Sequence, residues 1–226
     1  MKRYPTILIG ILLALAATAQ TGGRPVTLSA GVEAGIPIGE FEDSWGREIF
    51  GFSGNLTMPM RLLPFDWGVD FAWGRMGGES KEVTVNEEYL EVTTGDLRVH
   101  SDIFGYHGLL RLKPFNGKVS PYIEGLAGVR QFTTRTVIDV DGLDAPLFEE
   151  RNANEFIWSH GWAAGVQVAP GKNFYLELRV EQLNGGQVEY VDPNSITIGD
   201  DGLVEFGTLH SGVRVVNIHA GIGLRF

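Results

Sequence analysis

Serine and histidine, the usual nucleophile and base of a catalytic centre, stand next to each other three times in this sequence. The pairs are His100-Ser101, Ser159-His160 and His210-Ser211. Adjacent side chains on a strand point to opposite faces, so none of these pairs can act together there. The Gly-x-Ser-x-Gly elbow and the His-x-x-x-His zinc motif are both absent. We therefore expect no catalytic residue, no cofactor and no enzymatic activity.

Metal binding has one candidate segment. Asp139, Asp141 and Asp144 place carboxylates at the short spacing that calcium ligands have. The remainder of the twelve-residue calcium loop and its flanking helices are missing, so we expect a solvated acidic loop, with calcium bridging as the alternative. His107 and His219 lack a carboxylate at a recognisable ligand spacing, and we expect hydrogen-bonded core histidines rather than a metal or proton site.

Charge and composition exclude several protein classes. The 226 residues carry 18 Lys and Arg against 28 Asp and Glu, a net charge of −10, which argues against nucleic acid as a partner. The absence of cysteine excludes disulfides, a catalytic thiol and a lipid anchor on an N-terminal Cys. A hydrophobic fraction of 43% is too high for a disordered chain and too low for a helical membrane protein.

The N-terminus has the pattern of a secretory signal peptide. Lys2 and Arg3 precede an apolar stretch at 7–17, and Ala17-Thr18-Ala19 is a small-x-small cleavage site. The alternative, a membrane anchor helix, needs about 20 apolar residues. We therefore predict a signal peptide at 1–19 and one exported domain at 20–226.

The rest of the chain alternates between apolar and polar residues with a period of two, which predicts strands. Short connections with Pro, Gly and Asn alternate with long acidic ones at 41–50, 76–100, 133–155 and 184–212. This order predicts an up-and-down meander whose short turns all lie at one end. The eight predicted strands are 28–40, 51–62, 67–75, 101–112, 121–132, 156–168, 174–182 and 216–226.

The apolar face of these strands can point inward, as in a soluble ligand-binding barrel, or outward into lipid. It carries no formal charge, and a charge at the bilayer midplane costs ~2–4 kcal/mol. The polar face is rich in glycine, and aromatic residues such as Trp67, Trp158 and Phe174 lie towards strand ends on the apolar face, where an interfacial girdle belongs. We therefore predict an all-β, eight-stranded antiparallel up-and-down transmembrane β-barrel.

The signal peptide, the eight amphipathic strands and the closing Gly221-Ile222-Gly223-Leu224-Arg225-Phe226 resemble small outer-membrane β-barrel proteins, the outer-membrane protein A/X-like "porin family". The resemblance implies a location in the outer membrane, with periplasmic termini. It implies that Phe226 is the assembly signal read by the barrel-assembly machinery. Outer-membrane lipids and lipopolysaccharide are the other partners that it implies, and a monomer is expected.

The polar faces contain nearly balanced formal charges. A charge buried in a narrow lumen is costly unless it is paired, so the pattern predicts a closed, salt-bridged interior. A channel for ions or small solutes, gated by exchanging Arg and Glu partners, is the alternative. The predicted network comprises Glu33, Arg61, Asp70, Arg111, Glu124, Arg130, Glu177, Arg179, Glu181 and Arg225.

The long segments hold most of the acidity. Alternating patches at 82–85, 196–198 and 203–206 predict hairpins above the membrane, with Asp200-Asp201-Gly202 as a tip. Such hairpins suit partner binding by strand addition, or they are a solvated acidic surface. The function we predict is structural or loop-mediated binding. Lipid modification is disfavoured, because the His-x-Ser spacing of small barrels that deacylate lipid A is missing.

Overall fold

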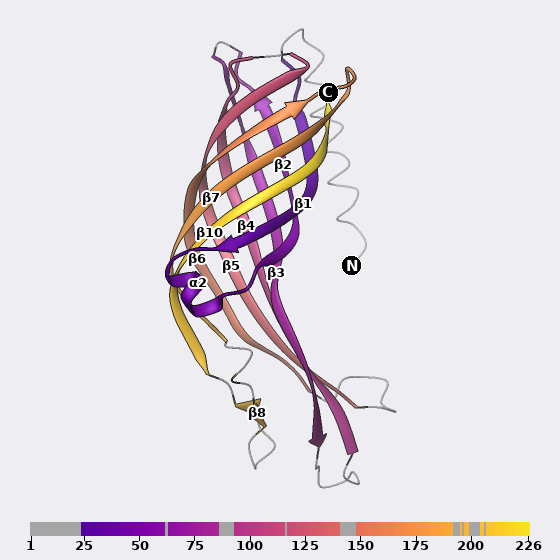
Figure 1. The fold of residues 1–226 in the computed structure, drawn as a ribbon, viewed down its shortest axis with the longest axis vertical. Coiled ribbons are helices and arrows are strands. Elements are labelled where there is room, and N and C mark those ends of the chain that lie inside the picture. Colours follow the sequence, from indigo (N-terminus) through magenta and orange to yellow (C-terminus); the bar gives the residue numbers. More distant parts are fainter. Residues whose placement is uncertain are drawn as a thin grey trace.

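The computed structural model describes residues 24–61, 63–85, 93–115, 117–140, 148–191, 195, 197–198, 204–205 and 207–226. Eight antiparallel strands form a closed barrel, in which each strand pairs with its sequence neighbours and β10 returns to β1 (Figure 1). The predicted eight-stranded up-and-down barrel is confirmed. Its strands are β1 (Thr27–Pro37), β2 (Ile49–Pro59), β3 (Phe65–Val85), β4 (Thr93–Leu112), β5 (Val119–Val140), β6 (Phe148–Val168), β7 (Phe174–Val191) and β10 (Thr208–Arg225).

The register of the ladders sets the tilt of the strands. A path from partner to partner around the barrel starts at Thr27 and returns to β1 at Pro37, ten residues further on. An eight-stranded barrel with this stagger has strands tilted by roughly 40° from its axis. The path runs through Thr27, Thr57, Gly68, Leu109, Leu126, Gly161, Leu183, Val215 and Pro37.

Polarity is inverted relative to a soluble barrel. Val32 and Ile222 on the outer face are 68% and 64% exposed, whereas Arg111 and Arg179 on the inner face are 0% and 1% exposed. Strand geometry explains this separation, because successive side chains point to opposite sides of the sheet. On β3 the outward residues remain uncharged from Phe65 until Arg75. Ten residues at this tilt rise by roughly 25 Å, the height of a barrel's lipid-facing band.

Several strands are longer than the sequence predicted. β3 and β4 stay paired as far as Val85 and Thr93, and β5 and β6 as far as Ile138 and Phe148. These projections leave the barrel at the end opposite the short turns (Figure 1). The hairpin predicted from the alternating patch at 82–85 is confirmed by the β3–β4 pairing, whereas the continuation of β5 beyond 132 was not predicted because its outer part lacks a continuous apolar face.

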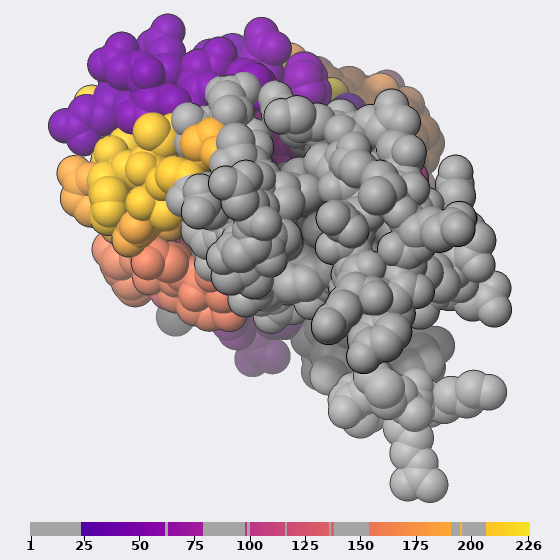
Figure 2. Space-filling view, turned by 90° about the horizontal axis from the view of Figure 1, so that it is seen from below, coloured from indigo at the N-terminus to yellow at the C-terminus, as the bar shows by residue number. Residues whose placement is uncertain are grey.

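Two further elements lie at the projecting end. β8 (Thr197–Ile198) pairs with β9 (Val204–Glu205), so the hairpin predicted at 196–206 is present. The segment predicted as a loop at 41–50 contains a six-residue helix, α2 (Glu40–Trp45), which ends at Gly46 in the left-handed conformation. So short a helix shows no periodic pattern in the sequence. In Figure 2, which views this end, the α2 segment (purple) lies against β10 (yellow).

α2 closes the lumen at this end with apolar side chains. Phe41 is fully buried, and its ring meets those of Phe132 and Tyr190 edge to face, with centroids 6.5 and 5.8 Å away. Trp45 packs against the same Tyr190 at 5.8 Å. Ile49 from β2 and Ile157 from β6 belong to the same buried cluster. The interior thus has an apolar layer at the projecting end, and its charged part lies between this layer and the short turns.

Some predictions fall on residues that the structure does not describe. The predicted signal peptide at 1–19, the hairpin tip at 200–202, and Asp141 and Asp144 of the calcium candidate all lie outside the described residues. The backbone of Asp139 pairs with Asp96 near the end of β5. Among the described residues, no helix is both long enough and apolar enough to cross a bilayer.

Candidate functional site: the charged lumen

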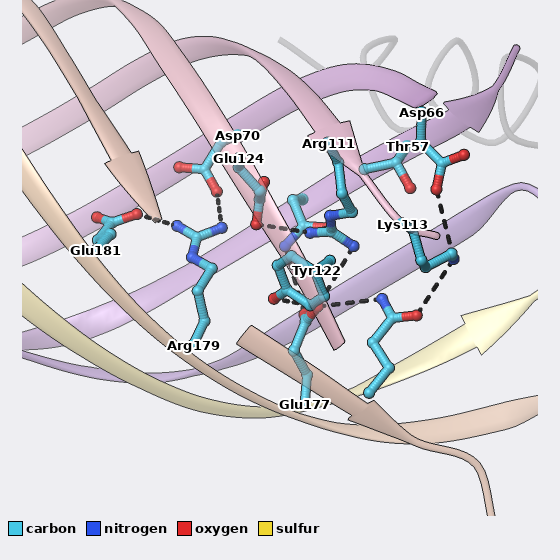
Figure 3. A network of polar contacts seen from close by, with 12 residues as sticks. Thr57, Asp66, Asp70, Arg111, Lys113, Tyr122, Glu124, Glu177, Arg179 and Glu181 are labelled. Atoms are coloured by element: carbon cyan, nitrogen blue, oxygen red, sulfur yellow. Dashed lines mark hydrogen bonds and ion pairs between the residues drawn. The ribbon is translucent and has the colours of Figure 1, made fainter. Parts of the chain in front are cut away.

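Arg111 is the centre of one buried charge cluster. It extends inward from β4 to Glu124 of β5, with 3.1 Å from Nη2 to Oε1, and to Glu177 of β7, with 3.4 Å from Nη1 to Oε1 (Figure 3). Its guanidinium carbon lies 4.0 Å from the ring centroid of Tyr122, a cation–π contact. All three charged side chains are completely shielded from solvent.

Neutral groups satisfy much of the remaining hydrogen-bonding capacity around Glu177. The Tyr122 hydroxyl donates to Oε1 of Glu177 over 2.8 Å, and Nε2 of Gln167 donates to the same oxygen over 3.2 Å (Figure 3). Asn55 accepts from Arg111 over 3.2 Å. Buried charges that are both paired and hydrogen-bonded in this way are compatible with a folded interior.

Arg179 organises a second cluster closer to α2. Its Nη1 lies 2.7 Å from Oδ1 of Asp70, and its Nη2 donates to Glu181 (Figure 3). Nδ2 of Asn217 donates to the other oxygen of Glu181 over 2.6 Å. One guanidinium therefore bridges carboxylates of β3 and β7, which suits the forked geometry of arginine.

A third cluster, which the sequence analysis missed, lies at the end with the short turns. Nζ of Lys113 is 3.4 Å from Oδ2 of Asp66, and Nη1 of Arg24 is 3.2 Å from Oδ1 of the same residue. Burial lowers the pKa of Lys113, and the nearby Asp66 carboxylate opposes that shift. Lys113 directly follows β4. Because Arg111 faces inward, extending the alternation of β4 by two residues would have predicted that Lys113 faces inward too.

Most residues of the predicted network face the lumen, and one lies elsewhere. Arg61 is exposed in the turn after β2, because that strand ends at Pro59; its assignment to the lumen was wrong. Arg225 is partly buried at the short-turn end of the lumen, with its guanidinium carbon 5.2 Å from the ring centroid of the buried Tyr175. The others that face the lumen are Glu33, Asp70, Arg111, Glu124, Arg130, Glu177, Arg179 and Glu181.

A small cavity of about 30 Å³ separates the Arg179 cluster from the apolar layer, lined in part by Glu33, His107 and Arg130. Nη1 of Arg130, both ring nitrogens of His107 and Oε2 of Glu33 have no hydrogen-bond partner among the described residues. A space of this size holds about two water molecules, which would satisfy such atoms. Buried side chains of the Arg179 cluster and of the apolar layer lie on either side of this space.

The structure also forms a serine–histidine pair that adjacency in sequence did not reveal. Oγ of Ser53 lies 2.7 Å from Nδ1 of His219, joining β2 to β10 across β1. Both side chains are buried, and Nε2 of His219 has no partner among the described residues. Among the described residues no carboxylate hydrogen-bonds to this imidazole, and the pair links β2 to β10 inside the barrel. The described residues contain no cluster suited to a metal ion.

No protein-family model and no curated protein sequence matches the chain. Neisserial surface protein A is similar in structure, with 16% identity, a TM-score of 0.43, and coverage of 89% of this chain and 97% of its own. Ail of Yersinia pestis has 19% identity and a TM-score of 0.38, with coverage of 90% of this chain and 99% of its own. OprG of Pseudomonas aeruginosa has 13% identity and a TM-score of 0.44, with coverage of 90% of this chain and 96% of its own.

The chain's own geometry identifies the fold. An antiparallel sheet that closes on itself, an uncharged outer band of roughly 25 Å and a charged interior are the properties of a barrel that spans a bilayer. The chain has the fold of a small, closed, eight-stranded β-barrel, with the apolar exterior and charged interior of one that spans a membrane.

Proposed function

We propose that this protein is a closed, non-conducting barrel of the outer membrane whose projecting strands serve as a platform for binding. The observation that supports this best is the filled lumen. Paired charges occupy the part of the lumen towards the short turns, and Phe41 and Trp45 cap the part at the projecting end. About 30 Å³ of space remains between them. Eight strands enclose a space that side chains can fill, unlike the wider barrels of porins.

The proposal includes an orientation. The short turns, the start of β1 and the end of β10 would face the periplasm. The β3–β6 projections and the β8–β9 hairpin would face the exterior. Signal-peptide export, insertion by the barrel-assembly machinery through Phe226, contact with lipopolysaccharide and a monomeric state belong to the same proposal. The role is non-enzymatic.

Conductance tests the closed lumen directly. In planar bilayers the wild-type protein is expected to give no discrete current steps, because the Arg111 and Arg179 clusters leave no continuous path. Steps in the wild type that change in size in Arg130→Ala or Glu124→Gln would contradict the closed lumen. That result would support the gated channel instead, in which the cavity beside Arg130 is part of the path.

A further inference from the structure

One row of outward-facing residues crosses five ladders of the barrel and changes character along its length. Each residue is the register partner of the next, so the row runs perpendicular to the strands and rises obliquely because they tilt. It is polar at the end near α2, small in the middle and apolar at the other end. From β10 to β3 it comprises Arg214, Asn184, His160, Ala127, Gly108 and Val69.

The three polar side chains at one end of the row have no partners that would explain their presence on the outer face. None of the side chains of Arg214, Asn184 and His160 forms a hydrogen bond or ion pair within the described part of the chain. His160 is exposed between Trp158 and Trp162, which are themselves 62% and 55% exposed. A histidine facing lipid is costly unless it has a partner, and therefore marks a candidate binding site.

A groove begins at His160. It has a volume of about 620 Å³, its small outward residues are Gly108, Gly125 and Ala127, and it extends as far as Leu110 and Trp67. A second groove of about 660 Å³ shares Gly108 and continues past Val69 to β1. The surface is therefore hollowed along the same oblique direction as the row.

The glycines of this groove are not required by the backbone. A Cβ at Gly125 would meet nothing within 4 Å, and one at Gly108 would meet only the Ala127 carbonyl oxygen at 3.7 Å. Gly128, in contrast, has the Tyr106 carbonyl oxygen 2.0 Å from where its Cβ would lie. Gly108 and Gly125 therefore leave open a space that side chains could have filled.

We propose that this surface binds one anionic, phosphate-bearing lipid of the outer leaflet, a site that rests on the membrane location proposed above. Its acyl chain lies in the Gly108–Gly125 groove, and its headgroup is held by Arg214, Asn184 and His160. The carbonyl oxygen of Arg214 accepts from the amide of Ile38, which lies beside α2. Arg214 is therefore at the α2 end of the barrel, where the headgroup would lie. A guanidinium and an imidazole above an apolar groove match the two parts of such a lipid.

Native mass spectrometry of the full protein, released from nanodiscs with equal phosphatidylglycerol and phosphatidylcholine, tests the site. The wild type is expected to retain phosphatidylglycerol over phosphatidylcholine roughly fivefold, since one cation near the surface contributes about 1 kcal/mol. Arg214→Gln should remove the headgroup preference, and Gly125→Leu should reduce the retention of both lipids by filling the groove.

Two matched variants serve as controls. Arg75→Gln removes another exposed outward arginine at the same end of the barrel, and Ala220→Leu enlarges an exposed outward residue outside the groove. Both should bind lipid like the wild type. No preference in the wild type, unchanged binding in Arg214→Gln and Gly125→Leu, equal losses in the controls, or a dimer in place of bound lipid would each overturn the site. A wild type that behaves as a soluble protein would overturn the membrane location with it.

Discussion

At the scale of single residues, the lumen depends on which charges meet. The alternation of the sequence predicts that Arg111, Glu177 and Arg179 face inward, but not that Arg111 reaches Glu177 across 66 positions or that Arg179 joins Asp70 across 109. Those pairs depend on the ten-residue stagger of the barrel, which follows from closing all eight ladders at once and cannot be read from one strand.

Arg179→Leu is expected to destabilise the barrel by about 3–5 kcal/mol, because it leaves Asp70 and Glu181 buried without their cation. Urea unfolding in lipid vesicles, followed by tryptophan fluorescence, measures the change. Arg75→Gln is the control, since that side chain is exposed and its ion pair with Asp102 should contribute less than about 1 kcal/mol. Equal effects of the two substitutions would contradict the assignment of Arg179 to a buried ion cluster.

At the scale of elements, the sequence predicted the existence of every barrel strand and misjudged their ends. Alternation identifies a strand most clearly where one face meets lipid, so β5 was recognised only within the bilayer band, whereas the alternating patch at 82–85 also indicated the projection of β3. α2 was missed because six residues show no helical period, although Phe41 and Trp45 were both present in a segment read as acidic loop.

Phe41→Ala should cost about 3–5 kcal/mol of unfolding free energy, because a fully buried aromatic ring is lost and α2 no longer packs on Phe132 and Tyr190. Hydrogen exchange should increase in the amides of α2 while those of the Arg111 cluster stay protected. Phe50→Ala, which removes an outward ring that is 62% exposed, is the comparison. A loss for Phe50→Ala as large as that for Phe41→Ala would show that α2 is not a plug.

At the scale of the whole molecule, the near-zero mean hydropathy of +0.01 averages three regions of different polarity. The outer face is apolar, the inner face is charged and nearly balanced, and the long connections are acidic. The fold was predictable because each region leaves a local pattern. The oblique row from Arg214 to Val69 was not, since its members lie on six strands and become neighbours only through the register.

The closed sheet should make the folded protein resistant to detergent. Unheated samples are expected to migrate faster on a detergent gel than boiled ones, because all eight ladders of the barrel must open together before the chain expands. Identical migration before and after boiling, together with recovery in the soluble periplasmic fraction, would show that the barrel does not reside in a membrane.

The position of α2 has a consequence for assembly. The helix lies in the connection between β1 and β2, yet its side chains pack on β5 and β7, and Glu40 accepts from the Gly212 amide of β10. The first hairpin of the chain therefore carries a part that is completed only by its last strands. The contacts that close the sheet, between β1 and β10, and those that enclose Phe41 therefore depend on the same late part of the chain. We expect the barrel wall and its α2 plug to form together.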